Sequence, residues 1–413
     1  MDLVSTPWQV VTTALAFLFG ILVACAAARW FGTDFRRALL LYFWHTSFSV
    51  VYALYVNRYG GDSLHYYLTG LKADVTFSFG TAAVSYITIF FASILGLSFL
   101  GTFVAFSLFG YIGLMAVDAS FRIATENKSR LVRYFATLIV LLPSISFWSA
   151  AIGKDALSFM AAGLILWAAL NPARRTWLIV VSVLTMLLVR PHMAGIIVIA
   201  LAGSHSLQPG VPLSRRILVG GAALAACAIL VPFAVDYAGL KGGLSGEELS
   251  SYIEQRQSVN REGGGGIDIA RMSFPMQLFT YLFRPLPFEA FNAFALAASL
   301  DNVMLLFLFV AGGWQLLKRR TPSSTVNRTF LWLYASLSWS ILAMTSANLG
   351  ISLRQKWMFA PMLIFLMLSA VGRNRRIISF HVRSNDSLGR QYELHLVQPT
   401  EQHLSTSGPR RAS

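Results

Sequence analysis

Long apolar segments recur along the chain and are separated by short polar loops. A helix needs about 20 apolar residues to cross the hydrocarbon core of a bilayer, and fewer where flanking side chains reach back to the interface. By this measure the pattern predicts about eleven transmembrane helices, and therefore an all-α, polytopic integral membrane protein. The predicted spans are 8–28, 38–56, 97–117, 134–149, 156–170, 177–189, 193–204, 217–235, 300–317, 329–346 and 357–371.

The loops between these spans alternate in character, one set being short and rich in arginine. The positive-inside rule places that set in the cytoplasm, which predicts an outer N-terminus and a cytoplasmic C-terminus. The basic stretch 122–133 is one of these loops, so an odd number of crossings must precede it. We therefore expect 80–96 to be an amphipathic or re-entrant element at the outer interface rather than a further span.

The spans divide the chain into a transmembrane domain, 1–371, and a tail, 372–413. The domain carries two long outer loops, 57–96 and 236–298, which we expect to contain interfacial helices. Within the second loop, a charged stretch at 247–262 has glycines on both sides, which fits either a hinged lid or a flexible insertion. The tail is rich in arginine and then polar, which predicts a disordered cytoplasmic segment.

The composition agrees with a membrane protein. Hydrophobic residues make up 56% of the 413 residues and charged residues only 12%, too few to cover a soluble globule of this size. The net charge of +15 lies mostly in short loops and in the tail, as expected for cytoplasmic faces, so we expect membrane lipids as partners and no nucleic acid. Cys25 and Cys227 fall inside apolar segments and indicate small core residues.

Basic residues on the outer face are unexpected, because membrane insertion selects against them there. Any one of them could simply reach to lipid headgroups. For the set as a whole, a pocket for a phosphate or pyrophosphate group is the better interpretation, since the planar guanidinium grips two oxygens at once. The set consists of Arg58, Lys72, Lys154, Arg190, Arg284, Arg354 and Lys356.

The most polar segment beside a span is 57–70, which contains two adjacent glycines. These permit a tight turn that aims Asp62 and His65 back toward the bilayer. A carboxylate held there could accept the proton of a sugar hydroxyl as that hydroxyl attacks an anomeric carbon. The alternative is a helix start, with Asp62 or Ser63 as the N-cap.

Two further outer turns carry candidate side chains. In the first, Lys154 precedes Asp155, and the two could neutralise each other or Lys154 could bind a substrate phosphate. In the second, His192 follows Arg190 and Pro191, and it could be a second base, a hydrogen-bond donor to phosphate, or a structural histidine.

No metal or other cofactor is expected at this face. The outer loops contain no Asp-x-Asp pair and no cluster of cysteine and histidine, which are the usual ligand patterns. A nucleotide-sugar donor would usually require a metal and a cytosolic site. A sugar transferred here is therefore expected to come from a polyprenyl phosphate or pyrophosphate carried in the bilayer.

With these residues the chain resembles two related groups of membrane enzymes, the GT-C glycosyltransferases and the bacterial O-antigen-type polysaccharide polymerases. The resemblance implies a general base at Asp62 and lipid-phosphate binding by the later outer basic residues. The residues that carry it are Asp62, Lys154, Arg190, Arg284, and Arg354 followed by Pro361. Asp62 follows the second span, whereas the GT-C acid usually follows the first. Either a helix has been added, or the polymerases are the better comparison, which would favour Arg190 and His192 over Asp62.

The expected function is glycosyl transfer or polymerisation in surface polysaccharide synthesis, on the outer face of a bacterial inner membrane. The substrate would be a polyprenyl-linked sugar, and other polysaccharide-assembly proteins would be possible partners. A transporter or flippase of an anionic lipid-linked sugar is the main alternative, since it needs the same phosphate-binding arginines. A structural assembly partner is a third possibility.

Overall fold

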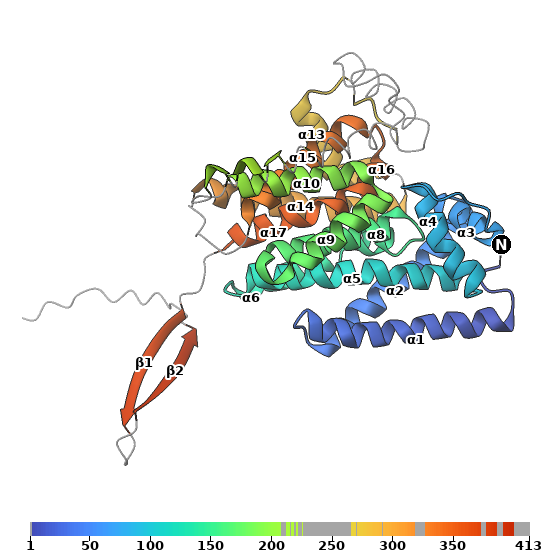
Figure 1. Cartoon of the computed structure of the whole chain (residues 1–413). Helices are drawn as coiled ribbons and strands as arrows, with labels where there is room; N and C mark the ends of the chain where they lie inside the picture. Colours follow the sequence, from blue (N-terminus) through green and yellow to red (C-terminus); the bar gives the residue numbers. More distant parts are fainter. Residues whose placement is uncertain are drawn as a thin grey trace, which may run out of the picture.

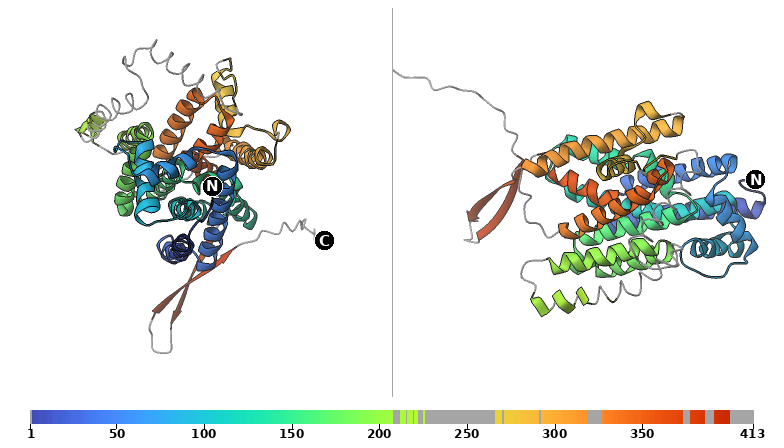
Figure 2. Two further views of the ribbon diagram at one scale, coloured as in Figure 1. Left: turned by 90° about the vertical axis from the view of Figure 1, so that its right-hand side faces the viewer. Right: turned by 90° about the horizontal axis from the view of Figure 1, so that it is seen from above.

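The computed structural model describes residues 2–207, 266–269, 271–290, 292–318, 327–372, 377–385 and 391–399, with a few more between 212 and 225. Among the described residues up to 372, the regular elements are helices, apart from a β-bridge between Gly266 and Asn348, and the long helices lie side by side in a bundle (Figure 1, Figure 2). The predicted charged stretch 247–262 and most of the predicted span 217–235 lie outside the described residues.

Two long helices and two short ones precede the central helix of the bundle. The first part of the chain forms α1 (Pro7–Trp30), α2 (Phe35–Tyr59), α3 (Asp62–Lys72), α4 (Thr81–Ile89), the short π-helix η1 (Phe90–Ile94) and α5 (Phe99–Thr125). The segment 80–96 is thus a short helical element, and one long helix follows it, as the parity of the loops predicts. Figure 1 shows α3 and α4 at one end of α5 and α6 at the other.

The second part of the chain surrounds α5. It forms α6 (Arg130–Val140), α7 (Pro143–Ser149), α8 (Lys154–Ala169), α9 (Pro172–Val189), α10 (Pro191–Ser206), α13 (Phe274–Phe283), η2 (Pro287–Glu289), α14 (Ala293–Lys318), α15 (Arg328–Thr345), α16 (Leu349–Gln355), η3 (Lys356–Met358) and α17 (Ala360–Ala370). Proline occupies the first turn of several of these helices, where its missing N–H costs nothing.

Six of the described helices are long and apolar enough to cross a membrane, and a bent pair, α16–η3 with α17, makes a seventh. Every predicted span outside 217–235 overlaps a helix, but some of these helices are shorter than a full crossing requires, such as α8 with 16 residues. The structure therefore supports a helical membrane protein, with fewer clear spans among the described residues than the eleven expected.

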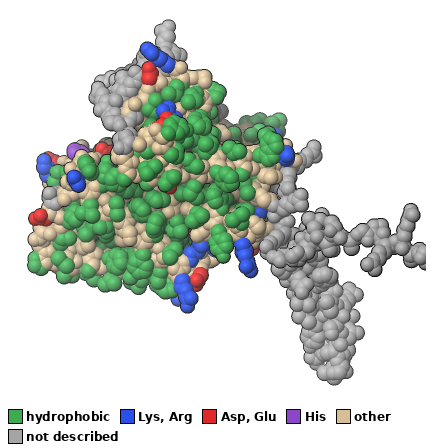
Figure 3. Space-filling view, turned by 180° about the vertical axis from the view of Figure 1, so that it is seen from behind, with side chains coloured by type: hydrophobic (Ala, Val, Ile, Leu, Met, Phe, Trp, Pro, Cys, Tyr) green, Lys and Arg blue, Asp and Glu red, His purple; other side chains and the backbone are tan. Residues whose placement is uncertain are grey.

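The surface of the bundle is apolar where lipid would touch it. On α1, the side chains of Leu15, Phe19 and Leu22 are more than half exposed. Figure 3 shows hydrophobic side chains over most of one face, with few charged ones among them. A soluble protein rarely exposes so large an apolar surface, so this belt favours contact with lipid.

Close packing inside the bundle depends on small residues. Gly113 of α5 faces Gly163 of α8, and a Cβ atom on Gly163 would collide with the Gly113 backbone. Helices in a membrane gain most from such close backbone approach, because the lipid surroundings give them no hydrophobic driving force. This contact fixes α8, and with it the residues at the start of α8, against the central helix.

The described part of the tail contains a pair of strands. Two strands, β1 (Ile377–Asn385) and β2 (Gln391–Pro399), pair in antiparallel register within the stretch expected to be disordered. The described bundle is all-helical, as the apolar segments predict. Apolar and polar residues alternate in both strand sequences, which is typical of β-structure.

Candidate functional site: a four-charge cluster

A glycine pair positions the first residue of the site. Gly60 and Gly61 have φ values of 76° and 140°, which other residues rarely adopt, and they turn the chain sharply between α2 and α3. Asp62 is consequently the first residue of α3, as the predicted turn requires. Gly61, not Asp62 or Ser63, is the N-cap, which leaves the Asp62 carboxylate available for a contact elsewhere.

A break between two helices positions the second residue. Helix α9 ends at Val189 and α10 begins at Pro191, so Arg190 has non-helical dihedral angles between them. The Arg190 guanidinium donates from Nη2 to Asp155 Oδ1 at 2.5 Å and from Nε to Ser158 Oγ at 3.2 Å. Asp155 and Ser158 lie three residues apart near the start of α8 and therefore share one face of that helix.

Arg354 of α16 completes the arrangement. Its Nη1 donates to Asp62 Oδ2 at 3.1 Å, and its Nε lies 3.2 Å from Asp155 Oδ2. Asp155 thus bridges the two arginines, and Arg354 bridges the two aspartates. We call Asp62, Asp155, Arg190 and Arg354 the four-charge cluster.

The cluster is buried at one end and open at the other. The exposed fraction of the side chain rises from 7% for Arg190 and 14% for Asp155 to 26% for Arg354 and 67% for Asp62. Among the described residues, no hydrogen bond uses Arg190 Nη1 or Arg354 Nη2. Each guanidinium therefore retains a donor for an anionic ligand, while its bonds to aspartate hold it in place.

Tyrosines line the cluster on two sides. Burial raises the pKa of Tyr66 on α3 to about 12, and the negative charge of Asp62 adds to the effect. Burial also raises the pKa of Tyr281 on α13, whose hydroxyl has no hydrogen-bond partner among the described residues. Both phenols stay protonated at neutral pH, so both are potential hydrogen-bond donors beside the charged groups.

Lys356 does not join the cluster, although it lies two residues from Arg354. Its side chain is fully buried, and its ammonium donates to Asn302 Oδ1 of α14 at 2.5 Å. Asn302 in turn donates to the carbonyl of Pro285 at 3.0 Å. Lys356 therefore ties η3 to α14, and this position keeps it from a phosphate at the surface.

Arg284 also has a separate partner. It forms an ion pair of 2.5 Å with Glu289, and about a fifth of each side chain is exposed. Burial alone would raise the pKa of Glu289, but hydrogen bonds from Arg284 and from the Leu286 N–H, together with the Arg284 charge, lower it. Arg284, which the sequence predicts to bind phosphate, is thus paired with a carboxylate five residues further along the chain.

The remaining predicted residues surround the cluster or lie at the surface. Lys154 is the first residue of α8, adjacent to Asp155, and His192 lies in the first turn of α10, two residues after Arg190; both are partly buried. His65 is exposed on α3, one turn after Asp62. Arg58 is exposed, and its guanidinium lies 5.4 Å from the centre of the Tyr59 ring.

Asp155 is the residue that sequence reasoning did not propose. Its neighbour Lys154 gives a simple explanation for a carboxylate at this position, so Asp155 was interpreted only as a neutralising partner. The structure pairs it with two arginines that are 35 and 199 positions away. The spacing of Asp155 and Ser158 on one helix face is a weak signal that a single sequence contains.

Metal ligation has no support in the described part of the chain, where no three side chains of His, Cys, Asp or Glu come together in a group that could hold an ion. Both carboxylates of the four-charge cluster are already paired with arginine. Each carboxylate of the cluster therefore has a cationic partner in the protein.

No protein-family model, curated protein or solved structure matches this chain. The resemblance to GT-C glycosyltransferases and O-antigen-type polymerases thus rests on the residues quoted above. Function has to be argued from the geometry of the site, since a fold alone does not determine it.

Proposed function

We propose that this chain is an integral membrane enzyme that transfers a sugar from a polyprenyl-(pyro)phosphate carrier, and that the four-charge cluster is its active site. The observation that supports this most strongly is the convergence of Asp62, Asp155, Arg190 and Arg354 from four separate segments. Two arginines with unused donors lie beside a carboxylate that is open to ligand. This combination suits a substrate with an anionic leaving group and a neutral hydroxyl nucleophile.

The proposed reaction divides the roles between the two ends of the cluster. Asp62, the most exposed member, accepts the proton of the acceptor hydroxyl. At the same time the oxygen of that hydroxyl forms a bond to the anomeric carbon of the donor sugar. The bond between that carbon and the phosphate oxygen breaks, and the carrier leaves as a phosphate or pyrophosphate anion. The unused donors of Arg354 and Arg190 stabilise the negative charge on the departing oxygens.

Asp155 has a positioning role in this scheme. It accepts hydrogen bonds or ionic contacts from both arginines and so fixes the distance between their guanidinium groups. Lys154 and His192, which flank the cluster in sequence, are additional candidates for contacts with the phosphate. The partners of Arg284 and Lys356 favour structural roles for these two residues.

The proposed orientation places the cluster outside the cell. The cluster lies where α2 ends and α8 begins, and the helix ends remote from it carry Arg37, Arg122 and Arg130. The positive-inside rule assigns the arginine-rich end to the cytoplasm. This assignment supports an outer N-terminus and a site on the outer face, and we propose with it about eleven crossings of a bacterial inner membrane.

One observation favours a transporter as the second candidate. His45 lies in the middle of α2, and its imidazole is fully buried. Ionisable side chains at membrane depth often mark a path for substrate or protons. A flippase of an anionic lipid-linked sugar would use His45 on that path and the arginines at its outer end.

The experiment that separates these candidates uses the full-length chain in liposomes with a radiolabelled polyprenyl-phosphate-linked sugar and an acceptor glycan. The proposal predicts release of the polyprenyl carrier, a loss of at least about 100-fold in rate for Asp62→Asn, and no loss for Asp74→Asn. Asp74 is an exposed carboxylate of the same outer loop and serves as the matched control. Transport of the donor without release would establish the flippase, and full activity of Asp62→Asn would refute the assigned base.

A further inference from the structure

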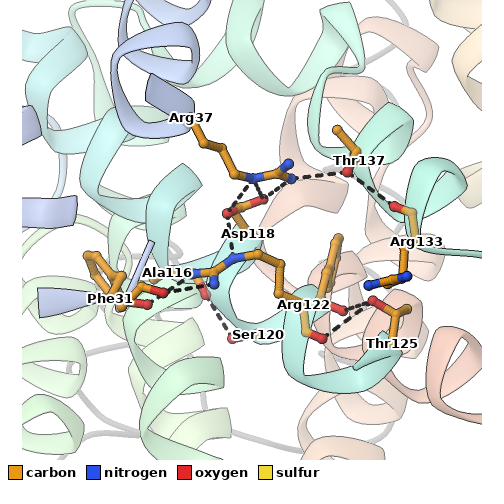
Figure 4. A network of polar contacts seen from close by, with 11 residues as sticks. Phe31, Arg37, Ala116, Asp118, Ser120, Arg122, Thr125, Arg133 and Thr137 are labelled. Carbon is orange, nitrogen blue, oxygen red and sulfur yellow. Dashed lines mark hydrogen bonds and ion pairs between the residues drawn. The ribbon is translucent and has the colours of Figure 1, made fainter. Parts of the chain in front are cut away.

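A second group of charges lies between α2, α5 and α6, at the end of the bundle remote from the four-charge cluster. It surrounds a cavity of about 440 Å³, which we call the basic pocket. The polar side chains that matter for its chemistry are those of Arg37, Asp118, Arg122, Arg130, Arg133 and Thr137. Figure 4 labels all of these residues except Arg130 and shows the network from close by.

A buried carboxylate anchors the pocket. Asp118 of α5 has only 1% of its side chain exposed, and it accepts hydrogen bonds from Arg37 and Arg122. Arg37 also donates to Thr137 of α6 at 3.1 Å. A charge this deeply buried is tolerated because two guanidinium groups compensate it, so the arginines of the pocket are held in defined positions.

Each of the three guanidinium nitrogens of Arg122 already has a partner in the protein. Its Nε donates to Asp118, and its two terminal nitrogens donate to the carbonyls of Phe31 and Gly32, just after the end of α1. These bonds satisfy carbonyls that the end of a helix leaves without partners. Arg122 is therefore a structural residue that joins α1 to α5.

Three arginines of the pocket retain guanidinium donors for a ligand. Within the described part of the chain, Arg37 Nη1 makes no hydrogen bond, and the side chains of Arg130 and Arg133 have no polar contact. In Figure 4 the guanidinium of Arg133 carries no dashed line. The pocket lining contains four arginines against the carboxylates of Asp118 and Glu126, which gives it a net charge of +2.

We infer that the basic pocket binds a phosphate monoester group, whose charge of up to −2 matches the excess of the lining. The donors are Arg37 Nη1, Arg130 and Arg133, and guanidinium groups bind phosphate oxygens in pairs. The inference concerns a site apart from the four-charge cluster and does not depend on the proposed enzymatic activity.

The surroundings of the pocket accommodate a lipid as the source of this phosphate. Leu131, Tyr134 and Leu138 follow one another along α6 and are 77%, 68% and 54% exposed. Tyr134 also lines the pocket, so the apolar strip begins at its edge. Acyl chains can lie on this strip while the headgroup occupies the pocket, and a soluble phosphate compound would use the pocket alone.

The test is binding of defined probes to the purified full-length chain and its variants. Native mass spectrometry measures adducts of phosphatidic acid against phosphatidylcholine, and thermal unfolding in detergent measures inorganic phosphate against chloride at equal ionic strength. Arg133→Ala, an exposed position that does not threaten folding, is compared with Arg174→Ala, an exposed arginine at the start of α9. The expected result is an affinity at least about 10-fold lower for Arg133→Ala and an unchanged affinity for Arg174→Ala.

The two probes also identify the source of the phosphate. Preference for phosphatidic acid over phosphatidylcholine without stabilisation by inorganic phosphate establishes a lipid headgroup, and stabilisation by inorganic phosphate alone establishes a soluble ligand. Equal affinities of the wild type and Arg133→Ala would overturn the inference. An equal loss of affinity in Arg174→Ala would also overturn it. So would a wild type that binds phosphatidic acid no better than phosphatidylcholine and is stabilised by inorganic phosphate no more than by chloride.

Discussion

Asp155→Asn is the substitution that perturbs the four-charge cluster most severely while conserving the shape of the side chain. The asparagine has one oxygen to accept from Arg190 or Arg354, and its amide group turns two N–H donors toward the other arginine. Arg190 is the residue at risk, because its side chain is only 7% exposed and its other contact is the neutral hydroxyl of Ser158. The substitution therefore leaves a buried guanidinium without a counter-charge.

The expected magnitude follows from this burial. Removing one partner of a buried ion pair costs about 3–5 kcal/mol, because the remaining charge is left in a poor solvent. The lower end of this range applies here, since Arg354 retains Asp62 and is 26% exposed. Asp62→Asn removes the ion pair between Asp62 and Arg354, in which the Asp62 side chain is 67% exposed. Ion pairs at the surface contribute about 0–1 kcal/mol to the free energy of unfolding.

The measurement is the free energy of unfolding in mixed micelles, obtained by titration with a denaturing detergent. Asp155→Asn should lower it by about 3 kcal/mol and Asp62→Asn by less than about 1 kcal/mol. Adding Arg190→Gln to Asp155→Asn removes the uncompensated charge, so the double variant should be less destabilised than the two single losses combined. Equal losses for the two aspartate variants would refute the reasoning from burial.

Two further predictions concern other parts of the bundle. Gly110→Ala would push a Cβ atom against the carbonyl oxygen of Ser149, so it should cost about 1–3 kcal/mol of unfolding free energy, whereas Gly195→Ala, in open space, should not; an equal cost for both would contradict the predicted clash. Glu289→Gln tests the pair with Arg284 through pH. The pKa of Glu289 is lowered in the folded state from its ordinary value of 4.5. The ion pair therefore stabilises the folded protein fully at a pH above 4.5, and this stabilisation is lost as the pH falls through the pKa of the folded state. The difference in melting temperature between wild type and Glu289→Gln should therefore shrink in acid, and a constant difference from pH 7 to pH 3 would exclude the ionic contribution.

The positions and lengths of the apolar segments predicted most of the described helices. The apolar segments located helices throughout the described bundle, and counting the charged loops identified 80–96 as a short element rather than a span. The number of clear crossings was harder to predict, because helices such as α8 are short and buried by their neighbours. The prediction for the tail used its arginine-rich, polar sequence and its lack of an apolar core, which give no information on the pairing of β1 with β2.

The composition of the site was predictable in part. The rule that basic residues are rare on the outer face singled out Arg190 and Arg354, and the glycine pair singled out Asp62. Pairing could not be predicted, because the partners come from segments far apart in the chain. The same rule therefore also selected Lys356 and Arg284, whose positive charges have structural partners in the bundle.

Binding of the leaving group tests the central claim most directly, because it requires the four-charge cluster and no complete reaction. Titration of polyprenyl pyrophosphate into the full-length chain in nanodiscs would measure the affinity of the wild type and of Arg354→Gln. A lost charge-assisted contact of about 1.5–3 kcal/mol predicts an affinity 10-fold to 100-fold weaker for Arg354→Gln. An Arg354→Gln variant that binds as tightly as the wild type would contradict the account.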